Sequence, residues 1–389
     1  MRKTVIKINL LICVIALTTL FSGCKNPSQA DLADKSMQDI IADLNAVGLS
    51  VAVVKDNKLV YTNAFGYKDL SDSTKIVTND LFRIASISKT FTATAIMQLY
   101  EAGKFNLDDD VSDAFGMTIK NPNYPETTIT YRMLLSHTSS LSDKVGYFTF
   151  NVLDPEKKED RANVYNDYIP GSKYEYCNLG FNMLGALVEI HSGERFDQYI
   201  KNHIIDPLKL NAGFNVDELD SKLFVSLYNF EDGKFVYSPD AYESRAAALE
   251  NYIAGRTTTI FSPTGGMKIA PKDLAQHMLI QMNGGTFNGV TILQPESVLA
   301  MQTPYAYEDK NFDYGFAMVT TPKLIDGEVL KGHTGSAYGL YSAMFFEPEK
   351  KFGFIMMTNG CPAVRGENGF LSIQSDVINS LYNIFIQNK

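Results

Sequence analysis

Three short motifs carry side chains that together could activate a serine hydroxyl for attack on a carbonyl carbon. They hold Ser86 and Lys89 in "SISK", Tyr176 and Asn178 in "YCN", and His333, Thr334 and Gly335 in "HTG". A serine hydroxyl is a weak nucleophile until a base removes its proton. A lysine three residues further along a helix lies on the same face as the serine and can reach it. The first motif therefore predicts a nucleophile, Ser86, paired with an amine.

Each motif falls on an element that can present it. Residues 87–99 repeat apolar side chains at helical spacing and stop before Gly103, so Ser86 lies at a helix start. The second motif lies on a loop before a predicted helix, and the third lies on a predicted strand. Copies of the three motifs at residues 22–25, 61–63 and 191–193 fall at a cleavage site, in a hairpin and at a helix end, and lack this setting.

The rest of the chain predicts strands at both ends and helices between them. Hairpins are predicted at residues 49–67, around an Asp56-Asn57 turn, and at residues 340–358. Helices are predicted at residues 131–137, 179–193, 195–205, 271–285 and 371–387. This order predicts one antiparallel sheet built from both termini, with helical material inserted.

On these motifs the chain resembles the serine β-lactamase and penicillin-binding-protein superfamily. Within it, Tyr-x-Asn as second motif is typical of the branch of class C β-lactamases, DD-peptidases and related esterases. The likeness runs from about residue 49 to the end and includes the surroundings "LFRIASISKTFTA", "LLSHTSSL", "YEYCNLGFNMLG" and "GHTGSAYG". It implies an α/β (α+β) β-lactamase/transpeptidase-like fold, with an antiparallel sheet flanked by helices, an inserted all-α domain and an active site in the groove between them.

Domain bounds follow from the motifs and the composition. We expect a signal peptide at 1–23 and a lipidated tether at 24–38. The α/β domain is expected to comprise 39–110 and 255–389, and a mostly helical domain is expected at 111–254.

The resemblance also suggests how the proton leaves Ser86. A free lysine amine titrates near pH ~10.4, so either burial lowers its pKa or another group shares the proton. Tyr176 is the expected partner, because a nearby positive charge favours a phenolate. We expect Lys89 and Tyr176 to act as one proton-transfer unit, and which of them is the base stays open. Asn178 is expected to hydrogen-bond Lys89 and the amide of a substrate.

The resemblance further implies an oxyanion hole and a strand that lines the groove. The N–H groups of Ser86, at a helix start, and of Ser336 would bind the developing oxyanion. His333 and Thr334 would line the groove, and Gly335 would leave room for a substrate along the strand.

The chain departs from the family at two positions that bear on substrate. Many β-lactamases carry lysine where His333 stands, and a histidine, with a pKa near ~6.5, supplies little charge at neutral pH. Lys331 lies two residues upstream on the same strand face. Ser140 stands where the family usually has glycine. These departures favour a peptidase or esterase over an efficient β-lactamase.

Simpler interpretations compete with each assignment. Ser86 and Lys89 could belong to a capped helix with a solvated lysine, and Tyr176 could be a half-buried aromatic that holds a loop. His333 could be a packed, hydrogen-bonded core residue. The whole protein could be a non-catalytic penicillin-binding sensor or scaffold, although all three motifs are intact.

The N-terminus predicts export. Residues 1–7 contain three basic side chains and no acid, and residues 8–21 are apolar over a length typical of a signal peptide. Small residues before Cys24 resemble a bacterial lipoprotein cleavage site, which would make Cys24 the lipidated N-terminus and a membrane anchor. The alternative is a plain secretory peptide with a chance cysteine. In both cases we expect the protein in the cell envelope, in the periplasm or at the cell surface.

Composition excludes other classes of function. The net charge is −9, and an acidic surface repels phosphate, so no nucleic-acid partner is expected. The histidines show no spacing typical of a metal site, so neither metal nor cofactor is expected. Cys177 and Cys361 are expected as buried thiols, although two cysteines could also form one disulfide.

The leading hypothesis is a serine hydrolase with an acyl-serine intermediate, acting on a D-amino-acid peptide, with peptidoglycan as one source. The alternatives of the same class are an esterase and a weak β-lactamase.

Overall fold

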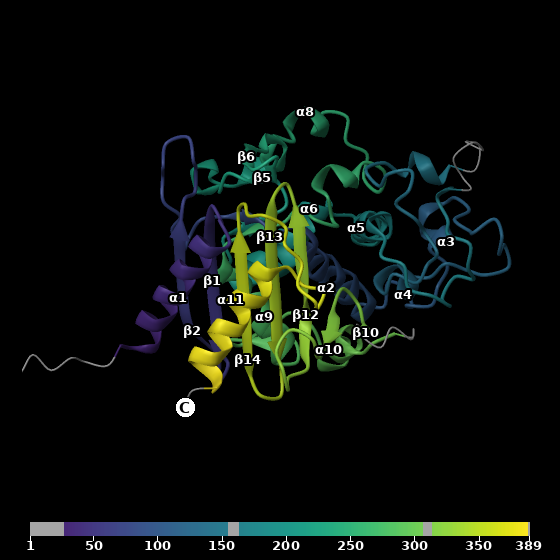
Figure 1. Ribbon diagram of the computed structural model, residues 1–389. Coiled ribbons are helices and arrows are strands. Elements are labelled where there is room, and N and C mark those ends of the chain that lie inside the picture. The colour runs from purple at the N-terminus through teal and green to yellow at the C-terminus, as the bar shows by residue number, and fades with distance from the viewer. Residues whose placement is uncertain (1–26, 155–162, 306–312, 388–389) are drawn as a thin grey trace, which may run out of the picture.

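The computed structural model describes residues 27–154, 163–305 and 313–387 (Figure 1). The predicted signal peptide and the predicted lipidation site, Cys24, lie outside the described residues. Within the described ranges, no helix combines the length and the apolar composition that a membrane span requires.

A seven-stranded antiparallel sheet forms the main layer, in the order β10-β11-β12-β13-β14-β1-β2. Its strands are β1 (Gly48–Lys55), β2 (Lys58–Gly66), β10 (Asp313–Tyr314), β11 (Val319–Thr321), β12 (Leu330–Ala337), β13 (Leu340–Glu347) and β14 (Phe352–Thr358). β1 pairs with β2 on one side and with β14 on the other. The prediction of one sheet built from both ends of the chain is therefore confirmed.

The two predicted hairpins form because their turns suit the twist of the strands. Asp56 and Asn57 between β1 and β2 both have positive φ, 51° and 60°, which short hairpin turns require and which these residue types tolerate. β13 and β14 pair in the same antiparallel way around residues 348–351.

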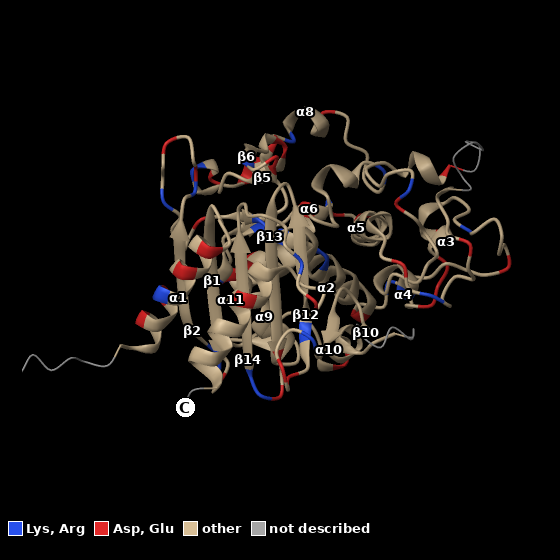
Figure 2. Ribbon diagram, viewed as in Figure 1, with Lys and Arg blue, Asp and Glu red and all other residues tan. Residues whose placement is uncertain are grey.

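Helices cover both faces of the sheet. α1 (Gln29–Asp43) and α11 (Ser372–Tyr382) lie side by side on one face, and α9 (Pro271–Met282) packs on the other (Figure 1). Successive side chains of a strand point to opposite faces, so Val51 and Val53 join the core under α1 and α11, whereas Ala52 and Val54 join the core under α9. Figure 2 shows the strands almost free of charged residues, as burial of both faces requires.

The predicted tether at 24–38 is wrong from Ser28 onward. Ser28 caps α1, with its side chain accepting from the Asp31 N–H while the Asp31 carboxylate accepts from the Ser28 N–H. Ala33 and Met37 are fully buried against the sheet and α11. Polar composition suggested a linker, but two apolar residues one turn apart are enough to dock a helix.

Shorter elements make up the rest of the described chain. The other helices are α2 (Ser88–Glu101), α3 (Val111–Phe115), α4 (Tyr131–Leu135), α5 (Asn178–Ser192), α6 (Phe196–Ile200), α7 (Asp206–Leu208), α8 (Ala246–Leu249) and α10 (Pro295–Gln302). The small sheets are β3 (Phe82–Arg83), β7 (Lys268–Ile269) and β4 (Ala212–Gly213); β5 (Tyr228–Glu231) and β6 (Lys234–Tyr237); β8 (Thr286–Phe287) and β9 (Val290–Thr291).

The described part of segment 111–254 contains more helix than strand, but it is not all-α as expected. It contributes β4 to a small sheet and contains the β5–β6 hairpin. The Asp232-Gly233 turn between two short aromatic runs is the local signal for that hairpin.

α2 is a buried helix that places the first motif in the interior. It follows a 3₁₀ turn, Ala85–Ile87, and packs against α5. Buried residues occupy nearly its whole length, including Lys89, Phe91 and Leu99. A helix buried on all sides leaves no solvent-facing side for a lysine near its start.

The docking of α1 can be measured by stability. We expect Met37→Ala to lower the free energy of unfolding by about 2–5 kcal/mol, because it removes a fully buried side chain and leaves a cavity. Lys35→Ala, on the exposed side of the same helix, should change it by less than about 0.5 kcal/mol. Urea unfolding of both variants checks this, and equal stabilities would mean that α1 is the loose tether first expected.

Candidate active site

Ser86 lines a cavity of about 250 Å³ to which both predicted domains contribute. Tyr147 and Asn178 come from the mostly helical segment, and Thr264 and Ser336 come from the part that carries the sheet. The residues of the first two motifs, which are 89 positions apart at Lys89 and Asn178, meet here.

Lys89 is fully buried and lies next to Ser86. Its Nζ is 3.1 Å from Ser86 Oγ, 2.9 Å from Asn178 Oδ1 and 2.9 Å from the Thr264 carbonyl oxygen. Burial lowers the pKa of Lys89 to about 7, against the opposing influence of Asp143 and Cys177. A capped helix with a solvated lysine is therefore excluded.

The three contacts define where the Lys89 lone pair points. Asn178 Oδ1 and the Thr264 carbonyl are acceptors only, so they take both hydrogens of a neutral amine. The lone pair of the amine is then left for the third contact, in which it can accept a hydrogen bond from the Ser86 hydroxyl. A neutral Lys89 is thus arranged to accept the proton of Ser86.

Asn178 is held in a single orientation by its neighbours. Its Oδ1 also accepts from Thr264 Oγ1 at 2.6 Å, and its Nδ2 donates to Asp143 Oδ2 at 2.9 Å. These contacts identify which amide atom is oxygen, and they leave one Nδ2 hydrogen for a substrate. The predicted hydrogen bond from Lys89 to Asn178 is present.

Tyr176 lies beside Lys89 but does not behave as expected. The amine is 4.8 Å from the centre of its ring. Burial raises the pKa of Tyr176 and outweighs the opposing influence of the nearby Ser86 hydroxyl. We expected the neighbouring amine to favour the phenolate, but this burial keeps the proton on the phenol. The Tyr176 oxygen is buried, and among the described residues it has no hydrogen-bond partner.

Two positioning residues escaped the sequence analysis. Asp143 accepts from the backbone N–H groups of Asn178 and Leu179, at 2.9 and 3.0 Å, and so caps α5. Thr264 contributes its carbonyl to Lys89 and its hydroxyl to Asn178. Neither has a local signal, because Asp143 caps a helix that begins 35 residues later and Thr264 contacts residues 175 and 86 positions away.

The third motif lies on β12, and its residues have different surroundings: some line cavities and His333 does not. Thr334, Gly335 and Ser336 line a cavity of about 360 Å³, and Ser336 also lines the cavity of Ser86. His333 is 4% exposed and lines neither cavity. The prediction that His333 lines the groove is corrected, and the packed core histidine is what the structure shows.

His333 is one end of a buried hydrogen-bond chain. Its Nδ1–H donates to the Thr334 carbonyl, so its Nε2 accepts from the Tyr314 hydroxyl at 3.1 Å. The Tyr314 oxygen accepts from His137 Nε2 at 3.2 Å, and His137 Nδ1 accepts from the Cys177 N–H at 3.1 Å. Burial lowers the pKa of His333 to about 3 and that of His137 well below its usual value. Both imidazoles are neutral, and the chain links β12 to the loop that carries Tyr176.

Gly335 serves packing between the protein's own segments. A Cβ there would lie 2.3 Å from the Ile84 carbonyl oxygen and 2.3 Å from Ser342 Oγ. Glycine therefore lets β12 approach the segment just before Ser86, where Ala85 has a φ of 49°. Gly335 also lines a cavity, so the expectation that it makes room for substrate stays a prediction beside this contact. The same contact holds Ser336 near Ser86, the two residues predicted to form the oxyanion hole.

The remaining residues that the sequence singled out are structural. Cys177 and Cys361 are both buried and free, and the Cys177 thiol points away from the cavity to Asp143. Lys331, the nearest cation upstream of His333, is partly buried and lies near Glu347 and Glu349. Across the described ranges no group of three metal-ligating side chains occurs.

The chain belongs to the Beta-lactamase family, whose model matches residues 33–372. Penicillin-binding protein 4* of Bacillus subtilis is 30% identical over 314 residues, which are 76% of this chain and 64% of the relative. Penicillin-binding protein 4 of Amycolatopsis lactamdurans is 25% identical over 330 residues, 80% of this chain and 81% of the relative. Protein flp of Staphylococcus aureus (strain MW2) is 22% identical over 331 residues, 80% of this chain but only 59% of the relative.

Solved structures show the same fold. The octameric penicillin-binding protein homologue from Pyrococcus abyssi superposes with a TM-score of 0.71 at 24% identity, over 90% of this chain and 76% of that one. EstCE1, described as a hydrolase with promiscuous acyltransferase activity, superposes with a TM-score of 0.69 at 21% identity, over 92% of this chain and 98% of that one. The β-lactamase/transpeptidase-like α/β fold with its antiparallel sheet is thereby confirmed.

The Lys89 amine predicts how the reactivity of Ser86 depends on pH. Because only the neutral amine can accept a proton, labelling of Ser86 by a fluorophosphonate should rise through pH about 7 and level off above it. Below that pH the rate should fall about tenfold per unit. His333→Gln is the matched control, since a group with a pKa of about 3 cannot set this inflection. An inflection near pH 10, or one that survives in Lys89→Ala, would contradict the role of the amine.

Proposed function

We propose that this protein is a serine hydrolase that forms an acyl-serine intermediate on a D-amino-acid-containing peptide or related amide. The observation that carries the proposal is the buried Lys89 amine, whose two acceptor contacts leave its lone pair for Ser86. A scaffold that forms no acyl-serine has no use for a near-neutral lysine aimed at a serine hydroxyl, so that alternative is disfavoured. A penicillin-binding sensor would use the same amine for acylation, and it differs from the proposed enzyme in showing no turnover.

The proposed reaction uses the described residues in two halves. Ser86 Oγ attacks the substrate carbonyl while its proton passes to Lys89, and the N–H groups of Ser86 and Ser336 bind the oxyanion. Collapse breaks the scissile bond, and the leaving group takes a proton from the protonated Tyr176–Lys89 unit. Water then attacks the acyl-serine and gives a proton to Lys89. The ester bond to Ser86 breaks, and Lys89 passes this proton to Ser86 Oγ, which restores the free hydroxyl and the neutral amine.

Several observations support a peptidase or esterase over an efficient β-lactamase. The histidine of the third motif is buried and neutral, so it offers no fixed cation to the carboxylate that β-lactams carry. Two similar relatives are named penicillin-binding proteins, and one structural neighbour is a hydrolase with acyltransferase activity. Esterase activity is the second candidate, because a small cavity around Ser86 suits short acyl chains as well as peptides.

Acylation at Ser86 can be tested directly. A fluorescent penicillin should label the wild-type protein, and the label should vanish in Ser86→Ala. Ser88→Ala is the matched control from the same motif, because the Ser88 hydroxyl accepts from the Met267 N–H and takes no part in the proposed chemistry. Turnover of a D-Ala-D-Ala peptide, a short-chain ester and a chromogenic cephalosporin by the same preparation then ranks the activities. Labelling that persists in Ser86→Ala would place the nucleophile elsewhere.

We propose further that the protein is exported and anchored through a lipid on Cys24. The N-terminal sequence supports this, and α1 begins at Gln29. At most ~3.5 Å per residue, the connection between Cys24 and α1 spans under about 20 Å. The body would then sit close to the membrane surface, with peptidoglycan as an accessible substrate.

The anchor has its own test. Expressed with a labelled fatty acid, the wild-type protein should incorporate label and pellet with membranes, while Cys24→Ser should lose the label and be released. Cys13→Ser, inside the predicted signal segment, is the control and should keep the label. A Cys24→Ser protein that still carries fatty acid would refute lipidation at this position.

A further inference from the structure

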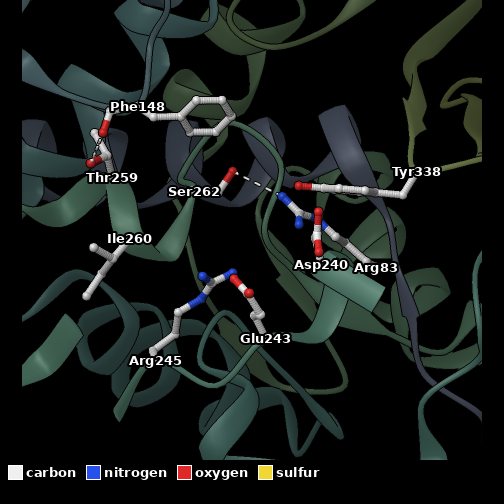
Figure 3. A pocket seen from close by; sticks show the side chains of 9 residues that line it. All are labelled: Arg83, Phe148, Asp240, Glu243, Arg245, Thr259, Ile260, Ser262 and Tyr338. Carbon is white, nitrogen blue, oxygen red and sulfur yellow. Dashed lines mark hydrogen bonds between the residues drawn. The ribbon is translucent and has the colours of Figure 1, made fainter. Parts of the chain in front are cut away.

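A second cavity, of about 440 Å³, continues from the one that holds Ser86. The two share four lining residues: Arg83, Phe148, Ser262 and Tyr338. A substrate attached to Ser86 can therefore extend into this space. Figure 3 shows that the guanidinium groups of Arg83 and Arg245 both point into it, from different elements.

Arg83 is fixed in place before any ligand arrives. It is 6% exposed. Its Nε donates to the Gly265 carbonyl at 2.9 Å and its Nη2 donates to Ser262 Oγ at 3.4 Å (Figure 3). The guanidinium stacks on the ring of Tyr338, 4.7 Å from its centre. Arginine has five N–H donors, so donors remain for a ligand.

The side chain of Arg245 has fewer hydrogen-bond partners than that of Arg83. Its side chain is half-buried, and its Nε is buried without a hydrogen-bond partner among the described residues. Asp240 and Glu243 line the same cavity, and Figure 3 draws their carboxylates on the side of the guanidinium groups. Both acids are exposed, whereas Arg245 is half-buried and Arg83 is buried. A buried donor without a partner is costly unless a ligand supplies one.

Arg83 and Arg245 are close enough to influence each other, because the charge of Arg245 lowers the pKa of Arg83, beyond the larger influence of burial. Lys268 is buried nearby but does not line the cavity; burial lowers its pKa well below the usual value, and its Nζ donates to the Phe214 carbonyl. Negative charge is present as well, since Asp240 and Glu243 line the cavity and the Asp217 carboxylate accepts from the Arg245 backbone N–H. A bound carboxylate would therefore be held by hydrogen bonds from the two guanidinium groups.

We infer that this cavity binds a carboxylate on the acyl part of the substrate, so that the enzyme prefers acidic acyl groups. A carboxylate matches the planar fork of a guanidinium and can accept from both arginines. The acyl side is chosen because the acyl group stays attached to Ser86, and this cavity continues from the one that Ser86 lines. The inference rests on the proposed function and names the substrate class of the same site.

Two isosteric substrates test the inference. They are the p-nitrophenyl esters of N-acetyl-D-glutamate, with a free side-chain carboxyl, and of N-acetyl-D-glutamine, with Ser86→Ala as the blank. We expect wild-type kcat/KM to favour the glutamyl ester by about tenfold or more. The ratio should fall toward one in Arg245→Gln and below one in Arg245→Glu.

Arg365→Gln is the matched control, since Arg365 lines the cavity on the other side of Ser86. It should keep the wild-type ratio. A wild-type ratio near one, an unchanged ratio in Arg245→Gln, or an equal fall in Arg365→Gln would overturn the assignment. Thermal melting of each variant shows that it is folded.

The inference and the proposed function can fail separately. Turnover of the glutaminyl ester without preference for the glutamyl ester would remove the acidic subsite alone. If neither ester is turned over beyond the blank, the proposed function fails, and calorimetry with N-acetyl-D-glutamate tests the cavity by itself. Binding to the full chain that is lost in Arg245→Gln supports the subsite, and no binding to the wild-type chain refutes it.

Discussion

The burial of one amine organises this structure. Lys89, on α2, is buried against the start of α5. A charged ammonium there would lose its hydration without gaining an ion pair in its place. The amine responds by giving up its proton near neutral pH. Asn178 and Thr264 then need only accept hydrogen bonds, and no carboxylate has to touch Nζ. A direct salt bridge would have kept the lysine charged and useless as a base.

The residues around Lys89 include a carboxylate, but this carboxylate does not contact the Lys89 amine directly. Asp143 bonds the backbone at the start of α5 and the Asn178 amide, so its negative charge reaches Lys89 through a neutral group. On the other side, His137 and His333 are held neutral by burial and by their shared contact with Tyr314. The phenol of Tyr176 keeps its proton mainly because it is buried, and the negative charge of Asp143 raises its pKa further. The base and the acid of the proposed reaction differ because their local environments differ.

The sequence predicted what is local and missed what is brought together by folding. The Ser86–Lys89 spacing, the Asp56-Asn57 turn and the two strand hairpins each encode their own geometry, and each appears as expected. The role of Asp143 could not be predicted, because it depends on a contact with a helix start 35 positions away. His333 and Gly335 were placed on the right strand, but their neighbours could not be predicted, since their surroundings come from residues 84, 314 and 342. The docking of α1 was missed because its apolar side is only one or two residues wide.

The position of β1 between β2 and β14 has a consequence for how the chain acquires its shape. Val53 pairs with Phe354, about 300 positions later, so the central ladder of the sheet closes only when the last tenth of the polypeptide is present. Contacts of such long range slow folding. Until then β1 has an open, apolar edge of the kind that other chains can extend. A product that ends before β14 still contains β12 with Ser336, but nothing joins β12 and β13 to β1 and β2 in one sheet. We expect such a product to aggregate and to be inactive rather than partly active.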